Sequence, residues 1–236
     1  SLTNKLTIVV TPLKALMEDQ VYELQELGFW NSVDFINSDR SLEIDHIYKK
    51  IAGGELNMIY VTPERFRSRS FERALKCRLE QNGGFEYIVF DEAHCISQWG
   101  NDFRPSYKNI KKLRELQPTV NVIALTATAT PEVIKDIITD LDFIQPKIFK
   151  QSFTRPNIAY MVFDETDKLY KIDAILKKNT ESSIIYVRSR KATLDISQYL
   201  NSKNISSTYY HGGLSHSEKD LHLNQWLNDQ KQVMVA

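Results

Sequence analysis

Short apolar segments alternate with longer amphipathic ones along the whole chain. The segments Leu6–Val10, Met58–Val61 and Phe85–Phe90 are almost wholly apolar, as strands buried in a parallel sheet are. Between such segments, apolar residues return at helical spacing, for example over 12–28, where a glycine ends the pattern. Strands that alternate with helices in this way predict an α/β fold built on parallel sheets.

The pattern divides into two series of strands and helices. The first predicts strands at 6–10, 32–36, 58–61, 85–90 and 121–125, with helices at 12–28, 42–52, after 64, at 107–116 and after 130. Residues 142–157 carry two prolines and little periodicity, which favours a linker. The second predicts strands at 184–187, 206–210 and 232–235, with helices at 191–200 and 215–227. We therefore expect two lobes, residues 1–150 and 151–236.

Two of the predicted helix starts carry side chains suited to capping. Thr130 is followed by Pro131 at the first helical position and by Glu132 near the positive end of the helix dipole. Ser215 and Glu218 have the S-x-x-E spacing of a capping box. These signals predict where the two helices begin.

Composition and charge narrow the classes of function. The chain has 236 residues, 42% hydrophobic and 25% charged, which is typical of a globular protein and excludes a disordered or collagen-like one. Its 30 basic residues balance 30 acidic ones, which excludes nucleic-acid binding through bulk charge but not a local basic groove. The two cysteines favour a reducing compartment, and no apolar run approaches the roughly 20 residues that span a bilayer. We expect a cytoplasmic protein with no membrane partner.

An acidic pair, Asp91 and Glu92, directly follows the apolar strand Phe85–Phe90. Ligands of open α/β sheets bind at the carboxyl ends of the strands. Transfer of a phosphoryl group from ATP requires Mg²⁺ and a residue that orients the attacking water. Because Mg²⁺ prefers carboxylates and keeps several waters, Asp91 is predicted to hold the metal through water and Glu92 to polarise the nucleophilic water. We expect His94 to be a hydrogen-bonding link in this site.

The residues around this pair resemble a known family. The run that starts at Asp91 reads DEAHCISQWG. It is followed by Asp102, Phe103, Arg104, Pro105 and Tyr107. This stretch is similar to the Walker B motif of the DEAH-type superfamily 2 helicases, and among them of the RecQ DNA helicases, fused to their aromatic-rich loop. The resemblance implies two RecA-like lobes, ATP and Mg²⁺ as cofactors, and single-stranded or partially duplex DNA as the partner.

Other segments match the family's motifs in the expected order. Thr11 and Pro12 resemble motif Ia, and the resemblance implies that they bind DNA or couple it to the ATP site. Thr126 and Thr128 resemble motif III, which implies a place in the ATP site; by spacing alone, their hydroxyls could equally satisfy backbone groups. The remaining matches are 60–65, the junction between lobes at 153–158, motif IV at 184–190, and 210–214. The resemblance therefore covers nearly the whole chain.

The loop after the acidic pair has a chemistry of its own. Trp99, Phe103 and Tyr107 stand among polar residues, with Arg104 between them. Aromatic rings stack on unpaired bases, at roughly 1–3 kcal/mol per base, and neighbouring cations contact phosphates. The alternative is that two of these rings form a small core of the loop. The resemblance implies that the loop senses single-stranded DNA and relays this to the ATP site, so all four residues are predicted to bind DNA or to couple it.

A basic stretch, residues 65–78, contains five arginines and one lysine. Because Glu64, Glu72 and Glu80 are interleaved with it, a solvated helix face is favoured over a phosphate-binding one. The five histidines have no spacing typical of a metal site, and both cysteines are expected to be structural.

One motif of the family is missing. The phosphate loop of ATP-binding motors, G-x-x-x-x-G-K-[ST], contains Gly-Lys, and no Gly-Lys dipeptide occurs in the chain. We expect both lobes to be incomplete, without the phosphate-loop strand and without motifs V and VI, and the chain to be inactive by itself.

The resemblance implies a monomeric 3′ to 5′ helicase that acts in DNA repair and recombination on the bacterial nucleoid. A related RNA helicase and a non-catalytic nucleic-acid-binding module remain as alternatives.

Overall fold

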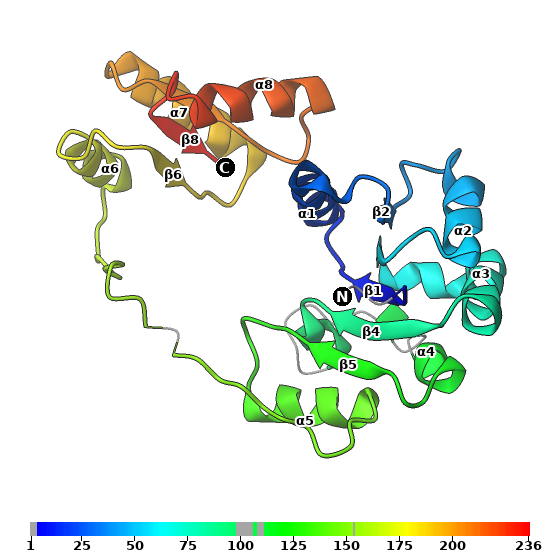
Figure 1. The fold of residues 1–236 in the computed structure, drawn as a ribbon. Helices are drawn as coiled ribbons and strands as arrows, with labels where there is room; N and C mark the ends of the chain where they lie inside the picture. Colours follow the sequence, from blue (N-terminus) through cyan, green and yellow to red (C-terminus); the bar gives the residue numbers. More distant parts are fainter. Residues whose placement is uncertain (1–3, 98–105, 108–110, 153) are drawn as a thin grey trace. The chain divides into compact units, whose positions relative to one another are not determined.

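The chain forms two compact units, residues 1–150 and 151–236 (Figure 1). The computed structural model describes residues 4–97, 106–107, 111–152 and 154–236, with only the backbone at 111 and 112. Each unit contains one sheet in which all described strands run parallel. The predicted α/β class is therefore confirmed. Three predicted site residues, Trp99, Phe103 and Arg104, lie outside the described residues.

The first unit is built on a five-stranded sheet in the order β2-β3-β1-β4-β5. Its strands are β1 (Leu6–Val10), β2 (Val33–Ile36), β3 (Met58–Val61), β4 (Phe85–Phe90) and β5 (Asn121–Ala124). Each of them lies within one residue of its predicted bounds. The central strand β1 pairs with β3 on one side and with β4 on the other. The strand that precedes the acidic pair therefore lies next to the centre of the sheet.

Helices connect these strands and cover the sheet. They are α1 (Lys14–Leu24), α2 (Ile44–Gly53), α3 (Arg69–Gln81), α4 (Lys111–Leu116) and α5 (Pro131–Asp140). Two short 3₁₀ turns, η2 (Pro63–Arg67) and η3 (Ala93–Ile96), follow β3 and β4. As predicted, Thr130 caps α5, because its side chain accepts a hydrogen bond from the backbone of Val133, and Pro131 opens the helix.

Apolar side chains of the first sheet fill two cores. Alternate residues of a strand point to opposite faces. Ile8 and Val10 accordingly join the larger core with residues of α2 and α3, while Val9 joins a smaller one with Met17 and Val21 of α1. Full burial of one such side chain stabilises the fold by roughly 1.5–3 kcal/mol. These cores hold the strand ends in place.

The end of the first helix departs from the prediction. The α-helix stops at Leu24, and the chain continues as a π-helical turn, η1 (Gln25–Phe29). Gly28 has φ of 98°, a conformation that glycine adopts without the steric cost that other residues meet. The α-helix thus ends at Leu24, before the predicted stop at Gly28, which lies inside the π-helical turn.

The second unit contains a three-stranded sheet in the order β6-β8-β7. The strands are β6 (Ser183–Ile185), β7 (Ser207–Tyr209) and β8 (Val233–Val235), and the helices are α6 (Lys168–Leu176), α7 (Arg190–Ser202) and α8 (His216–Leu227). The capping box of α8 is present as predicted: Ser215 Oγ accepts from the backbone of Glu218 at 3.3 Å, and the Ser215 backbone donates to the Glu218 carboxylate at 2.9 Å. The helix α6 was not predicted from the sequence.

Among the helices of the described residues, none is both long enough and apolar enough to cross a bilayer.

Candidate active site at the carboxyl edge of the first sheet

Several predicted site residues that the structure describes lie where β1, β4 and β5 end. Backbone hydrogen bonds continue past these strand ends, from Asp91 N to Val10 O at 2.9 Å and from Leu125 N to Phe90 O at 2.8 Å. They place Thr11, Asp91 and Thr126 at one edge of the sheet. This is the edge at which open parallel sheets bind ligands.

Asp91 is held by three contacts from different parts of the chain. The Thr11 hydroxyl donates to Oδ2 at 3.2 Å, the Glu92 backbone donates to Oδ1 at 3.0 Å, and the Tyr107 hydroxyl donates to the main-chain oxygen at 3.3 Å. An ionised carboxylate offers about four acceptor positions. Two of these are used by described residues, so Asp91 is oriented and still able to accept further hydrogen bonds.

The charge of Asp91 also affects a residue of β3, which is separated from β4 by β1. Tyr60 on β3 is buried. Burial, and next to it the negative charge of Asp91, raises the pKa of the Tyr60 phenol above its usual value. The phenol of Tyr60 is therefore a neutral neighbour of the carboxylate.

Glu92 and His94 form a second contact of the site. Glu92 has φ of 48° and ψ of 46°, a left-handed conformation that is uncommon outside glycine. The turn carries the glutamate side chain to His94, whose Nδ1 lies 3.2 Å from Glu92 Oε2. The same Nδ1 lies 3.0 Å from Thr126 Oγ1. His94 therefore links the glutamate after β4 to the threonine after β5, as a hydrogen-bonding residue.

The two threonines of the segment after β5 have different roles. Thr126 Oγ1 contacts His94 and also accepts a hydrogen bond from the backbone of Thr128 at 3.2 Å. The side chain of Thr128 is exposed, and within the described residues only its backbone joins this network. Of the two threonines predicted for the ATP site, the structure brings Thr126 to His94 beside the acidic pair and leaves the Thr128 side chain apart.

Tyr107 was predicted to bind DNA or to couple it to the ATP site, and its burial bears on the first of these two roles. Its side chain is only 3% exposed, and its hydroxyl donates to the backbone oxygen of Asp91. A ring buried to this extent has no free face for a base, so stacking on DNA does not fit Tyr107, and the alternative of a buried ring does. The preceding residue, Ser106, donates to Glu64 after β3 at 2.8 Å. The end of the loop is thus attached to two strand ends.

The structure bears on the DNA-binding half of the role predicted for motif Ia. Thr11 and Pro12 are buried, and Thr11 has no exposed surface. Because the Thr11 hydroxyl donates to Asp91, this side chain positions the carboxylate. Neither residue presents the surface that a direct DNA contact would need.

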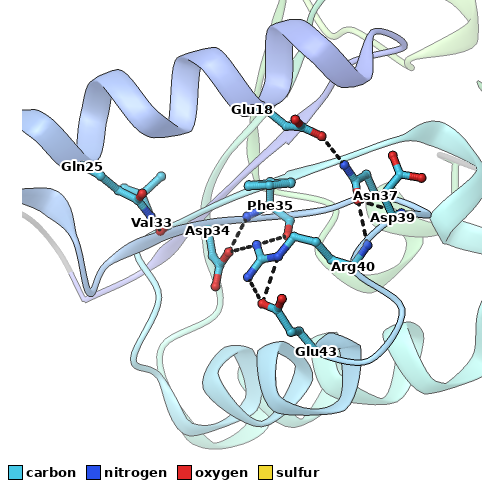
Figure 2. A network of polar contacts seen from close by, with 9 residues as sticks. All are labelled: Glu18, Gln25, Val33, Asp34, Phe35, Asn37, Asp39, Arg40 and Glu43. Atoms are coloured by element: carbon cyan, nitrogen blue, oxygen red, sulfur yellow. Dashed lines mark hydrogen bonds and ion pairs between the residues drawn. The ribbon is translucent and has the colours of Figure 1, made fainter. Parts of the chain in front are cut away.

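A polar network that the sequence analysis missed lies at the end of β2 (Figure 2). Asp34, 8% exposed, forms an ion pair with Arg40, with Nη1 to Oδ1 at 2.5 Å. The guanidinium of Arg40 also donates to Glu43 from Nε at 3.0 Å and lies 4.5 Å from the centre of the Phe35 ring. The hydrogen bond from Arg40 lowers the pKa of the Glu43 carboxyl below its usual value.

The turn inside this network is fixed by Asn37, which is 2% exposed. Its Oδ1 accepts from the backbones of Asp39 and Arg40 at 3.0 and 3.1 Å, and its Nδ2 donates to Glu18 of α1 at 2.5 Å (Figure 2). An asparagine that accepts from the backbone two residues later is a turn-forming signal. The asparagine after the strand and the aspartate inside that apolar strand are the signals by which the sequence could have identified this network.

The carboxylates at this edge of the sheet suit a magnesium ion that is shared with a nucleotide better than a metal ion held by protein side chains alone. Among the residues that the structure describes, no group of three or more His, Cys, Asp or Glu side chains is placed to hold a metal ion. Magnesium in nucleotide sites is bound by one or two carboxylates, waters and substrate phosphates. Asp91, oriented and with acceptor positions left, fits such a role.

Comparison with known proteins matches each of the two units to a helicase domain. The family described as DEAD/DEAH box helicase matches residues 1–137, and the helicase conserved C-terminal domain matches residues 165–236. The chain is 40% identical over 235 residues to the ATP-dependent DNA helicase RecQ of Bacillus subtilis, covering 98% of the chain and 38% of the relative. It is 35% identical to the RecQ-like DNA helicase BLM of Xenopus laevis, covering 98% and 17%. The chain thus spans less than two fifths of these relatives.

Solved structures share the fold at low identity. The helicase MrfA, bound to DNA and AMPPNP, superposes with a TM-score of 0.69 at 18% identity, covering 98% of the chain and 35% of that protein. The protein Dbp5 of S. cerevisiae, bound to RNA and ADP BeF3, superposes with a TM-score of 0.58 at 16% identity, covering 99% of the chain and 58% of that protein. These similarities confirm the predicted fold class, two parallel-sheet lobes of the helicase core.

Proposed function

The chain belongs to the DEAD/DEAH box helicase family and is of the RecQ type, and on this premise we propose that it supplies the Walker B part of an ATP-dependent DNA helicase. The observation that carries the proposal is the arrangement at the sheet edge. Asp91 is oriented by Thr11, and Glu92 is turned out of the strand toward His94 and Thr126. Two adjacent carboxylates in different environments suit two different roles in phosphoryl transfer.

Asp91 and Glu92 have different roles in the proposed hydrolysis of ATP. Asp91 would hold Mg²⁺ through water, and the metal, when bound, neutralises charge on the β- and γ-phosphates. Glu92 accepts a hydrogen bond from the attacking water and orients it. The contact of 3.2 Å from His94 Nδ1 to Glu92 Oε2 restricts the glutamate side chain. A positioned base of this kind contributes typically 10²–10⁴-fold to the rate.

Stimulation by DNA would act through the loop after β4. Tyr107 ties the end of that loop to the backbone of Asp91, so movement of the loop bears on the carboxylate. Trp99, Phe103 and Arg104, outside the described residues, remain the predicted DNA-contacting residues of the loop.

We propose DNA as the nucleic acid because the relatives with 35–40% identity are named DNA helicases, whereas Dbp5, bound to RNA, shares only the fold. The test is the ATPase activity of the whole protein with equal concentrations of single-stranded DNA or RNA of the same base sequence. We expect DNA to stimulate at least tenfold more than RNA. Equal or greater stimulation by RNA would favour the RNA-helicase alternative, and no ATPase with either would favour a non-catalytic binding module.

We further propose that the whole protein translocates 3′ to 5′, acts as a monomer in the cytoplasm and serves DNA repair and recombination. Unwinding of duplexes with either a 3′ or a 5′ single-stranded extension tests the direction. Preferential unwinding of the duplex with the 3′ extension is expected, and the reverse preference would contradict it.

We also propose that the 236 residues by themselves do not hydrolyse ATP. No Gly-Lys dipeptide is present in them to supply the lysine and backbone amides of a phosphate loop. A purified chain of this length is expected to show no ATPase above background, with or without DNA. Turnover that depends on Glu92 in this chain would contradict the proposal.

A further inference from the structure

The outer side of α3 carries a concentration of positive charge that the proposed catalytic arrangement does not use. Residues 65–78 contain six basic residues and one acidic residue, in a chain with no net charge. The structure sorts these residues by direction. Arg78 is fully buried, and Arg65 is partly buried with Nη1 3.5 Å from the Tyr48 hydroxyl. The other four basic side chains, Arg67, Arg69, Arg73 and Lys76, are exposed, and we call them the basic face of α3.

The basic face is held on a rigid support. The opposite side of α3 buries Phe71, Ala74 and Leu75 against the main core, where the helix packs beside residues of α2 and α4. Ser68 caps the helix by accepting a hydrogen bond from the backbone of Phe71 at 3.3 Å. A well-anchored helix presents its exposed cations with little loss of backbone entropy on binding.

The spacing of the cations along α3 suits a row of phosphates. Arg69, Arg73 and Lys76 stand at i, i+4 and i+7, which places them on one side of a helix. At 1.5 Å per residue they span about 10 Å. One strand of B-DNA carries a phosphate about every 3.4 Å of axis, so about three phosphates cover the same length. A shallow hollow of about 330 Å³ lies among Arg69, Glu72, Arg73 and Lys76.

Among the described residues, one ion pair involves the basic face of α3. Glu72 pairs with Lys76 at 2.8 Å. No ion pair within the part of the chain that the structure describes involves Arg67, Arg69 or Arg73. Arg69 and Arg73 lie on one side of α3, and Arg67 ends the turn η2 just before the helix. The like charges of these three guanidinium groups repel each other, and an anion that lies along the helix relieves that repulsion.

The position of the basic face connects it with the candidate site. The turn η2 follows β3 at the same edge of the sheet as Asp91, and Glu64 in that turn accepts a hydrogen bond from Ser106 in the loop after β4. Arg67 and Arg69 come next, and α3 then leads away from this edge. A nucleic acid that reaches the loop can therefore continue along α3.

We propose that the basic face of α3 binds the sugar-phosphate backbone of the DNA substrate, beyond the segment held at the loop after β4. The proposal rests on the proposed DNA helicase function and adds a second, sequence-independent contact to it. Guanidinium groups suit this purpose because each can donate two parallel hydrogen bonds to a phosphate. The contact would lengthen the DNA site without making the whole protein basic.

The salt dependence of DNA binding tests the proposal in the whole protein. Each phosphate contact adds about 0.9 to the slope of log K against log salt for duplex and about 0.7 for single strands. The variant Arg69→Gln/Arg73→Gln/Lys76→Gln is compared with wild type on a fluorescein-labelled duplex with a single-stranded 3′ extension. We expect the slope to fall by about 2 and the affinity at low salt to fall on the order of tenfold.

The control removes the same number of charges elsewhere. Lys49, Lys135 and Lys178 are exposed on three separate segments, and their triple glutamine variant is expected to bind as wild type does. An equal fall in both variants would assign the effect to bulk charge and overturn the proposal. Unchanged DNA binding in the α3 variant would also overturn the proposal. If that variant bound DNA as before but no longer bound phosphatidylserine vesicles, the basic face would be a membrane contact instead. Absence of DNA binding by the wild type would instead refute the helicase function itself.

Discussion

Nδ1 of His94 lies 3.0 Å from Oγ1 of Thr126, which joins two residues that are 32 positions apart in the sequence. The first follows β4 and the second follows β5, so the contact bridges the carboxyl ends of neighbouring strands. The same ring nitrogen lies 3.2 Å from the Glu92 carboxylate. A shift of the segment after β5 is thereby passed to the residue proposed to orient water.

Removal of the Thr126 hydroxyl is expected to lower ATP turnover. In Thr126→Val the side chain keeps its size and loses the contact to His94. A hydrogen bond to a polar group contributes about 0.5–1.5 kcal/mol, so kcat of the whole protein should fall about threefold to tenfold. Thr126→Ser should restore it. Thr139→Val, which changes an exposed hydroxyl on α5, is the control. Equal rates in Thr126→Val and the control would refute the relay.

Tyr107 is expected to stabilise the first unit through both its ring and its hydroxyl. Tyr107→Phe removes the hydroxyl that donates to Asp91 O and should lower the free energy of unfolding by about 0.5–1.5 kcal/mol. Tyr107→Ala also removes a buried ring and should cost about 3–5 kcal/mol. Urea unfolding measures both. Tyr22→Phe, at a side chain that is 61% exposed, should have no effect. A loss in Tyr107→Phe no larger than in Tyr22→Phe would contradict the hydrogen bond.

The ion pair at the end of β2 predicts a dependence of stability on pH. Arg40 lowers the pKa of the Glu43 carboxyl in the folded state below its ordinary value of 4.5. The resulting stability is therefore fully present above pH 4.5 and is lost as the pH falls through the folded pKa. Glu43→Gln should remove this part of the pH dependence, as seen in urea unfolding between neutral and acidic pH. Glu55→Gln, an exposed glutamate of the same unit, should leave it intact. The same pH dependence in both variants would refute the pairing.

The capping box of α8 predicts a cost for its serine in the second unit. Ser215→Ala removes an acceptor for the Glu218 backbone and should lower the free energy of unfolding by about 1 kcal/mol. The exposed Ser182→Ala is the matched control. Urea unfolding followed by a probe in the second unit measures the difference. Equal stability of the two variants would show that the box contributes nothing.

The strands of both sheets were predictable because apolar runs bounded by turn residues report burial directly. The helix α6 was missed because it is only nine residues long and buries little of its apolar surface: Leu169, Tyr170 and Ile175 are exposed, while Leu176 is buried. The cap was visible, since Asp167 accepts a hydrogen bond from the backbone of Tyr170. A capping residue is a weaker signal than periodicity, and it was the only clear one here.

The candidate site was predictable in composition but not in contacts. The acidic pair and Thr126 could be read from local sequence, since each follows a strand. The burial of Thr11 and Tyr107 could not, because it depends on which strands are neighbours in the sheet. The pairing of Asp34 with Arg40 likewise depends on a turn that brings the arginine back to its own strand. Such contacts follow from tertiary structure and carry no periodic signal.

The central claim is that Glu92 orients the water that attacks ATP. It is tested most directly by single-turnover ATP hydrolysis in the whole protein with Mg²⁺ and single-stranded DNA, comparing wild type with Glu92→Gln. The amide keeps the size of the carboxylate and removes its charge. We predict that hydrolysis falls by about 10²–10⁴-fold while the affinity for ATP stays within a few fold. Hydrolysis within tenfold of wild type, at equal ATP affinity, would contradict the account.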